Sequence, residues 1–292
     1  MIVDCHTHVW QSPDQLGNLD LGEVAQTPRN RAARFSPHRT AWRTVPSADP
    51  DHHWAQSAGV DKSIVLGFKS RYLGAEIPNQ YVADYVNRFP QKLIGFAGTD
   101  PTEAGVVAEL RAAQRDLHLR GITISPANQD FHPCDSRAMR VYAEAETLGM
   151  PLLIHPGGQF TEQSKLEFGR PYLLDEVGRT FPQLKLVIAQ IGQPWVDETV
   201  CLLAKHPNFF ADVSGLLPRP WQAYNALVLA HQYGVIDKLL FGSDFPYTSV
   251  HRCIESLYSI NQIAQGTNLP LIPREALRGI VERDALALLG LL

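Results

Sequence analysis

The chain has 292 residues, and its 26 Lys and Arg residues against 30 Asp and Glu residues give a formal net charge of −4. Hydrophobic residues make up 45% and charged residues 19% of the sequence, which is typical of a globular protein and excludes a disordered or fibrous chain. The negative charge also excludes a nucleic-acid-binding protein that relies on a strongly basic surface.

Neither membrane insertion nor export is expected from the sequence. No run of 18 apolar residues is present, and the apolar residues 1–3 are interrupted at once by Asp4 and His6, so no signal-peptide core forms. The four cysteines are far apart and form no C-x-x-C pair, which is typical of reduced thiols: Cys5, Cys134, Cys201 and Cys253. We therefore expect a cytoplasmic protein with neither nucleic acid nor a membrane as a partner.

Eight short apolar runs alternate with stretches of helix length. The predicted strands are 2–8, 62–67, 93–97, 121–125, 152–155, 184–189, 209–213 and 238–242. The predicted helices are 51–58, 79–88, 103–116, 136–148, 172–179, 195–205, 221–232 and 252–264. Repeated strand–helix units predict a parallel sheet, and eight of them predict an α/β protein with one closed (β/α)₈ TIM barrel over residues 1–292.

Two segments do not fit this repeat. The first is a long insertion at residues 10–50, rich in Pro, Gly and Asn, which would leave the first strand on the face where a barrel builds its active site. It is interpreted either as a solvated loop or as a cover over the substrate. The second is the tail 273–292, predicted to form helices packed outside the barrel. His52 and His53 lie at the start of helix 51–58, where we expect capping or surface roles.

The first candidate for chemistry is His6 with His8. Side chains alternate along a strand, so Asp4, His6 and His8 are expected to face one side, and Cys5 and Thr7 the other. Two inward imidazoles at the carboxyl end of a barrel strand can hold one metal ion. Trp10 follows this strand and is expected either to line the pocket or to pack in the core.

Further polar residues follow three other predicted strands. His155 ends the fifth, Gln190 ends the sixth and Asp244 follows the eighth. All of them fall at the end where barrels keep their active sites, and three His with one Asp form a sensible ligand set for a divalent transition metal. Polar residues commonly follow the end of a strand for structural reasons alone. This tendency accounts for one or two of these positions and not for the whole set.

These motifs together resemble a known family. The sequence Asp-Cys-His-Thr-His, the His155-Pro pair, the Gly-Gln-Pro-Trp segment and the Gly-Ser-Asp-Phe-Pro turn are similar to the amidohydrolase superfamily. They resemble most its amidohydrolase-related branch, with aminocarboxymuconate-semialdehyde decarboxylase, resorcylate-type decarboxylases and dicarboxylate lactone hydrolases. The resemblance implies a (β/α)₈ barrel with zinc or manganese at its top and, by matching position, His6, His8, His155 and Asp244 as ligands.

The sequence departs from this branch at two places. The branch usually has a histidine where this chain has Gln190, and a glutamine amide cannot exchange a proton near neutral pH. The fourth strand, residues 121–125, offers no lysine for the carbamate that bridges two metals in binuclear members. A single metal is therefore expected, although some lactone hydrolases of the branch use none.

The expected function is a metal-dependent hydrolase that acts on a small carboxylated or lactone-like substrate through metal-activated water. Asp244 is expected to transfer the proton, and Gln190 to orient substrate or water. Arginines of the insertion are expected to bind an anionic substrate group: Arg29, Arg31, Arg34, Arg39 and Arg43. The alternatives are a non-oxidative decarboxylase and a barrel that has lost catalysis and acts as a binding protein. Barrels of this kind are commonly homodimers.

Overall fold

The computed structural model describes residues 1–19, 46–156 and 161–292, and its centre is one eight-stranded sheet. The sheet has the strand order β1-β2-β5-β6-β7-β8-β9-β10, and each pair of neighbours is parallel. The strands are β1 (Val3–His8), β2 (Lys62–Leu66), β5 (Leu93–Gly98), β6 (Gly121–Ile124), β7 (Leu152–Ile154), β8 (Leu186–Ile188), β9 (Phe209–Asp212) and β10 (Leu239–Leu240). Each of the eight predicted strands is present, so the predicted (β/α)₈ fold is confirmed.

The barrel closes between its first and last strands by an unusual route. β10 is only two residues long, and the loop that follows it, residues 241–245, pairs with β1 instead. A parallel bridge joins Thr7 to Phe245. The hydrogen bonds of this seam, each 2.9 Å long, run from Cys5 N to Phe241 O, from Asp244 N to His6 O, and from His8 N to Phe245 O.

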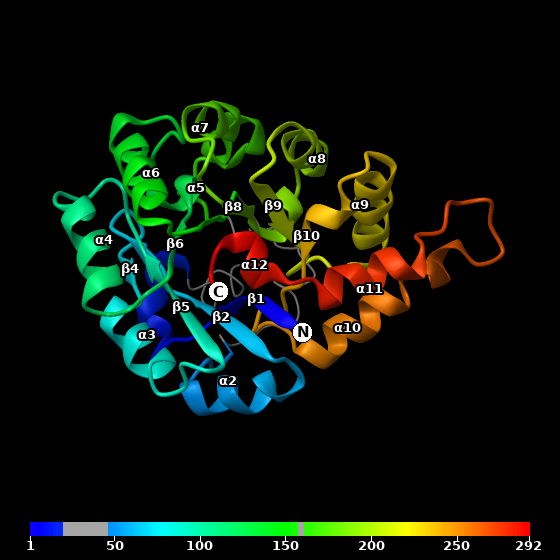
Figure 1. Cartoon of the computed structure of the whole chain (residues 1–292), viewed down its shortest axis with the longest axis horizontal. Coiled ribbons are helices and arrows are strands. Elements are labelled where there is room, and N and C mark those ends of the chain that lie inside the picture. The colour runs from blue at the N-terminus through cyan, green and yellow to red at the C-terminus, as the bar shows by residue number, and fades with distance from the viewer. Residues whose placement is uncertain (20–45, 157–160) are drawn as a thin grey trace.

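Most of the helices surround the sheet on its outside (Figure 1), and α12 covers one end of it. The helices are α2 (Pro50–Gln56), α3 (Asn79–Val86), α4 (Val106–Arg115), α5 (Pro126–Gln129), α6 (Ser136–Leu148), α7 (Asp175–Thr180), α8 (Val196–Lys205), α9 (Pro220–Gln232), α10 (Val250–Tyr258), α11 (Arg274–Glu282) and α12 (Ala285–Leu289). α6 matches its predicted bounds because Asp135 accepts a hydrogen bond from Arg137 N at its start and Gly149, with φ of 64°, ends it. The predicted helix 252–264 is divided into α10 and a 3₁₀ segment, Ile260–Ala264.

The hydrophobic core has two parts. The larger part lies between the strands and the surrounding helices. The smaller part contains alternate residues of the strands, such as Ile64, Leu66 and Leu240, together with Leu286 and Leu289 of α12. α12 therefore covers one end of the barrel, and Figure 1 shows it across the middle of the ring of strands.

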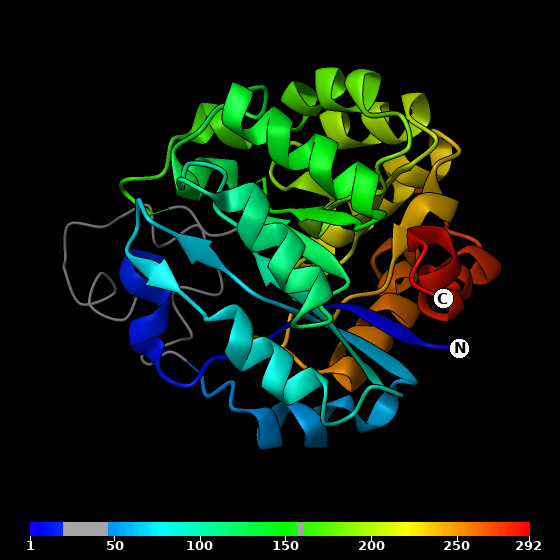
Figure 2. The same cartoon turned by 60° about the vertical axis from the view of Figure 1, so that its left-hand side comes forward.

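The opposite end of the barrel carries a short antiparallel hairpin that the sequence did not predict. Its strands, β3 (Lys69–Ser70) and β4 (Ala75–Glu76), have two residues each, too few for a recognisable alternating pattern. Figure 2 shows this hairpin, in cyan, on the far side of the barrel from α12. Within the described residues, no helix combines the length and the apolar character needed to cross a membrane.

Candidate active site

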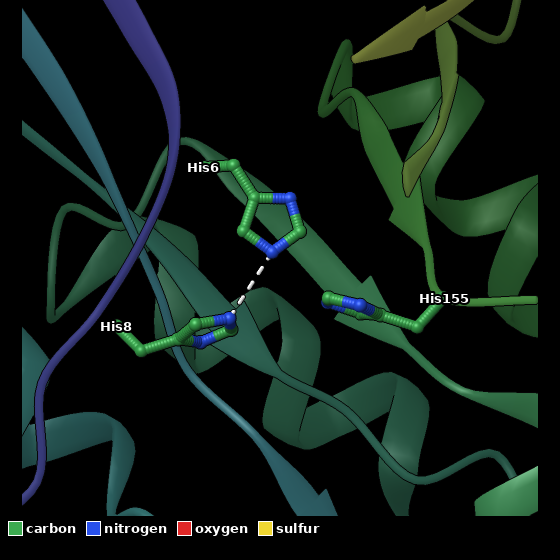
Figure 3. A group of neighbouring side chains, drawn as sticks. All are labelled: His6, His8 and His155. Atoms are coloured by element: carbon green, nitrogen blue, oxygen red, sulfur yellow. Dashed lines mark hydrogen bonds between the residues drawn. The ribbon is translucent and has the colours of Figure 1, made fainter. Parts of the chain in front are cut away.

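Three histidine side chains meet at the carboxyl ends of β1 and β7. His6 and His8 belong to β1, and His155 directly follows β7. The ring centroid of His6 lies 5.0 Å from that of His8 and 5.0 Å from that of His155. Figure 3 shows the three rings turned toward one another, and one nitrogen atom from each lies within 4.8 Å of the other two. The structure thus brings together three of the four predicted ligands.

A β-bulge in β1 produces this orientation and corrects one prediction. The register between β1 and β2 shifts between Asp4 and Thr7. Cys5 packs with the residues inside the barrel, whereas Asp4 and Thr7 line a small pocket with His53. The expectation that Asp4 faces the same side as His6 was therefore wrong, because a bulge reverses the alternation that the sequence pattern assumes.

Asp244, the fourth predicted ligand, lies beside the histidines. It follows β10 in the loop that closes the barrel, with φ of 61°, and it is buried. Its Oδ1 is 3.7 Å from His6 Nε2. Its Oδ2 accepts a hydrogen bond of 3.3 Å from the side-chain amide of Gln190. The nitrogen atoms that all lie within 4.8 Å of one another come from the three histidines. Asp244 lies next to this group, beside His6.

Gln190 lies in a tight turn after β8. The 3₁₀ segment Ala189–Gly192 contains two residues other than glycine with left-handed backbone, Gln190 (φ 54°) and Ile191 (φ 47°). Such values are uncommon for residues other than glycine. The turn leaves the Gln190 side chain at the edge of the pocket, where it contacts Asp244.

Asp212 is a buried polar residue of the site that the sequence reasoning missed. It ends β9, and its Oδ2 lies 2.9 Å from His6 Nδ1. Burial alone would raise its pKa, but attraction by His6 and hydrogen bonds from His6 and Ser214 hold the pKa below its usual value. The signal was available, because Asp212 follows an apolar run as His155 and Gln190 do. The prediction places Asp212 inside strand 209–213 and not after it, so Asp212 is absent from the expected site residues.

The three histidines, Gln190 and Asp244 open into a pocket with an apolar wall. Its apolar side consists of Trp10, Leu16, Phe68, Ile77 and Tyr247, and its remaining polar residues are Ser125 and Asn128. Trp10 was expected either to line the pocket or to pack in the core. It does both, because its side chain is buried and also lines the pocket. The described part of this lining includes no Lys or Arg side chain. The predicted anion-binding residues lie outside the described residues: Arg29, Arg31, Arg34, Arg39 and Arg43.

Electrostatics within the cluster favour neutral imidazoles at two positions. Burial, followed by repulsion from His6, lowers the pKa of His8 to about 3 and lowers the pKa of His155 well below its usual value. For His6, burial would lower the pKa, but attraction by Asp212 and Asp244 raises it overall. Burial raises the pKa of Asp244 to about 7. Neutral imidazole nitrogens beside a carboxylate are suitable donors for a divalent transition metal, so these residues fit one.

His53 differs from its predicted role. Its side chain is buried. Its Nε2 lies 3.0 Å from Thr7 Oγ1, and its Nδ1 lies 2.7 Å from Tyr85 Oη. Burial lowers its pKa to about 4. α2 is capped by Asp49, which accepts from His52 N, so only His52 has the expected surface position. Adjacent histidines at a helix start face different directions, and the sequence pattern could not show which one is inside.

Comparison with known proteins identifies the class to which this barrel belongs. The family model described as amidohydrolase matches residues 3–291, so the chain belongs to this amidohydrolase family. A search of curated protein sequences gave no match.

Several solved structures share the fold over 99% of this chain. An uncharacterised TIM-barrel protein from Bordetella bronchiseptica has a TM-score of 0.69 at 20% identity, with 99% of its own chain covered. A probable 2-pyrone-4,6-dicarboxylic acid hydrolase from Acinetobacter baumannii, with citric acid bound, has a TM-score of 0.65 at 15% identity, with 99% covered. A dihydroxybenzoic acid decarboxylase from Polaromonas sp., with bound manganese, has a TM-score of 0.64 at 14% identity, with 97% covered.

Proposed function

We propose that this protein is a metal-dependent hydrolase that acts on a small carboxylated or lactone-like substrate. His6, His8, His155 and Asp244 would hold one divalent transition metal, zinc or manganese. The observation that carries the proposal is the meeting of three imidazoles with Asp244 beside them, in a pocket at the carboxyl ends of barrel strands. Active sites of barrels of this kind lie at that end.

When bound, the metal would supply a Lewis acid that polarises a substrate oxygen and activates water. The protein supplies the proton transfer. Asp244 is the one carboxylate among the described residues that line the pocket. It is therefore the group placed to take a proton from water and return it to the leaving group.

Gln190 would hold Asp244 in place for this transfer. Its amide donates to Asp244 Oδ2, which leaves Oδ1 on the side of His6. A glutamine cannot replace the acid–base histidine usual at this place in the branch that the sequence resembles. Proton transfer by Asp244 is thus the arrangement that the residues of this pocket support.

The pocket wall supports a substrate with a flat or apolar body. Trp10, Phe68 and Tyr247 line the same pocket as the histidines, with Ser125 and Asn128 available as hydrogen-bonding groups. We propose that an anionic group of the substrate binds one or more arginines of the insertion 10–50, since guanidinium pairs with carboxylate through two hydrogen bonds.

The experiment that tests this function combines elemental analysis of the purified protein with an activity panel of lactones and small carboxylic acids. Hydrolysis of a panel member by metal-loaded protein is the expected result. Release of carbon dioxide would instead assign the protein as a non-oxidative decarboxylase. Inactivity of fully metal-loaded protein across the panel would favour a binding protein.

A further inference from the structure

Asp212 is a fully buried carboxylate whose two oxygen atoms contact different parts of the site. Oδ2 lies 2.9 Å from His6 Nδ1. Oδ1 accepts hydrogen bonds from Gln190 N at 3.1 Å, from Ser214 N at 3.0 Å, and from Ser214 Oγ. Asp212 is outside the described lining of the pocket, so its effect on a substrate would pass through these neighbours.

The bond to Asp212 determines which nitrogen of His6 carries a proton. A carboxylate only accepts hydrogen bonds, so His6 Nδ1 must be the donor. Ser214 Oγ is also 3.0 Å from His6 Nδ1, but its proton is directed to Asp212, so its oxygen faces the ring as an acceptor. In the neutral ring Nε2 then carries the lone pair, and it faces His8 Nε2 at 3.1 Å.

The same carboxylate fixes the turn that carries Gln190. Gln190 and Ile191 both have left-handed backbone, a conformation that β-branched residues such as Ile rarely adopt. The hydrogen bond from Gln190 N to Asp212 Oδ1 attaches the start of this turn to the end of β9. From this position the Gln190 side chain reaches Asp244.

We propose that Asp212 is a positioning residue that sets the protonated nitrogen of His6 and the conformation of the turn 189–192 together. One carboxylate would thereby orient His6 and, through Gln190, Asp244. The inference rests on the proposed function, because His6 and Asp244 matter together only if they bind the same metal. Buried partners of this kind commonly fix the tautomer of a metal-binding histidine.

The direct test uses Asp212→Asn in metal-free protein labelled with ¹⁵N. The new side-chain oxygen can still accept from Gln190 N and Ser214 N, whereas its NH₂ group would face His6 Nδ1. We therefore expect the proton of His6 to move from Nδ1 to Nε2, as observed in two-bond ¹H–¹⁵N spectra at pH 9. Binding of Co²⁺, followed by visible absorption, should weaken about 10–100-fold. The matched control is Ser214→Ala, which keeps the carboxylate and should keep the proton on Nδ1.

Two results would overturn the proposal. One is wild-type His6 protonated on Nε2 at pH 9, a measurement that holds even if the Asp212→Asn variant fails to fold by circular dichroism. The other is a folded Asp212→Asn variant whose His6 keeps its Nδ1 proton and whose Co²⁺ affinity is unchanged. If the proton moves in the variant but wild-type protein binds no Co²⁺, the positioning role stands and the proposed metal function fails.

Discussion

Gln190 and Asp244 meet across the end of β9, although they follow β8 and β10, which are not neighbours in the sheet. The distance from Gln190 Nε2 to Asp244 Oδ2 is 3.3 Å. Both residues have left-handed backbone, with φ of 54° and 61°. This pair provides a buried carboxylate with a neutral donor, so the site keeps an ordered Asp244 without an acid–base group at position 190.

The relative effects of substituting this pair test the assignment of roles. Asp244→Asn should abolish turnover even with metal bound, because an amide cannot take the proton. Gln190→Ala removes one hydrogen bond worth about 1 kcal/mol or slightly more, so we expect a loss of roughly five- to tenfold in kcat/KM. Steady-state kinetics on a substrate from the panel, with metal content measured for each variant, would show the order. A larger loss for Gln190→Ala would mean that the roles are reversed.

Metal content tests the ligand set itself. We expect about one equivalent of a divalent transition metal per chain, held by three imidazoles and a carboxylate. His155→Ala should lower the affinity strongly, since it removes one donor of the cluster. His251→Ala changes an exposed histidine of α10 and is the matched control. Full activity of metal-free protein after dialysis against a chelator would contradict the prediction.

Metal affinity should depend on pH in a defined direction. The pKa of His6 is raised above its usual value of 6.5, so at lower pH a proton competes with the metal for this ring. Affinity should therefore fall at least tenfold for each pH unit below the pKa of His6, and more steeply where Asp244, whose pKa burial raises to about 7, is also protonated. It should level off above both pKa values. Titration with Co²⁺ between pH 5.5 and 9 measures this slope. A flat profile would show that His6 is not a ligand.

Stability should also depend on pH through His53, away from the pocket. Its pKa is lowered to about 4 in the folded protein. In the unfolded chain it is about 6.5, so between these values the unfolded state binds more protons. Folding stability should thus decrease as pH falls from about 6.5 to about 4, by up to about 1.4 kcal/mol per pH unit.

The measurement is urea unfolding of metal-free protein at several pH values. His53→Gln can preserve contacts with Thr7 and Tyr85 but cannot titrate, so its stability should depend less steeply on pH than that of wild-type protein. His251→Gln, at an exposed position, should follow the wild-type curve. Parallel curves for all three proteins would exclude His53 as the titrating group.

The arginines of the insertion remain a prediction from sequence. Single alanine substitutions at positions 29, 31, 34, 39 and 43 should raise KM for an acidic substrate while leaving kcat nearly constant, because they would weaken binding in the ground and transition states alike. A neutral ester or lactone of similar shape is the control substrate. Five unchanged KM values would show that these residues do not bind substrate.

The barrel could be predicted because buried parallel strands leave a strong pattern. Runs of Ile, Val, Leu and Phe marked all eight strands, and polar residues after them marked His155, Gln190 and Asp244. The role of Asp212 and the bulge in β1 could not be predicted in this way. Asp212 acts through contacts with His6 and Gln190, which are distant in sequence, and a bulge changes the side-chain direction without changing the residue pattern.

The seam that closes the barrel links the site to the risk of aggregation. Asp244 N–H and the carbonyl of His6 form one of its hydrogen bonds, and His8 N–H forms another with Phe245. If these bonds open, β1 and β10 become free strand edges, which are templates for pairing with other chains. A ligand bound by His6, His8 and Asp244 would therefore hold the two sides of this seam together. Protein purified without that ligand should self-associate more readily on warming.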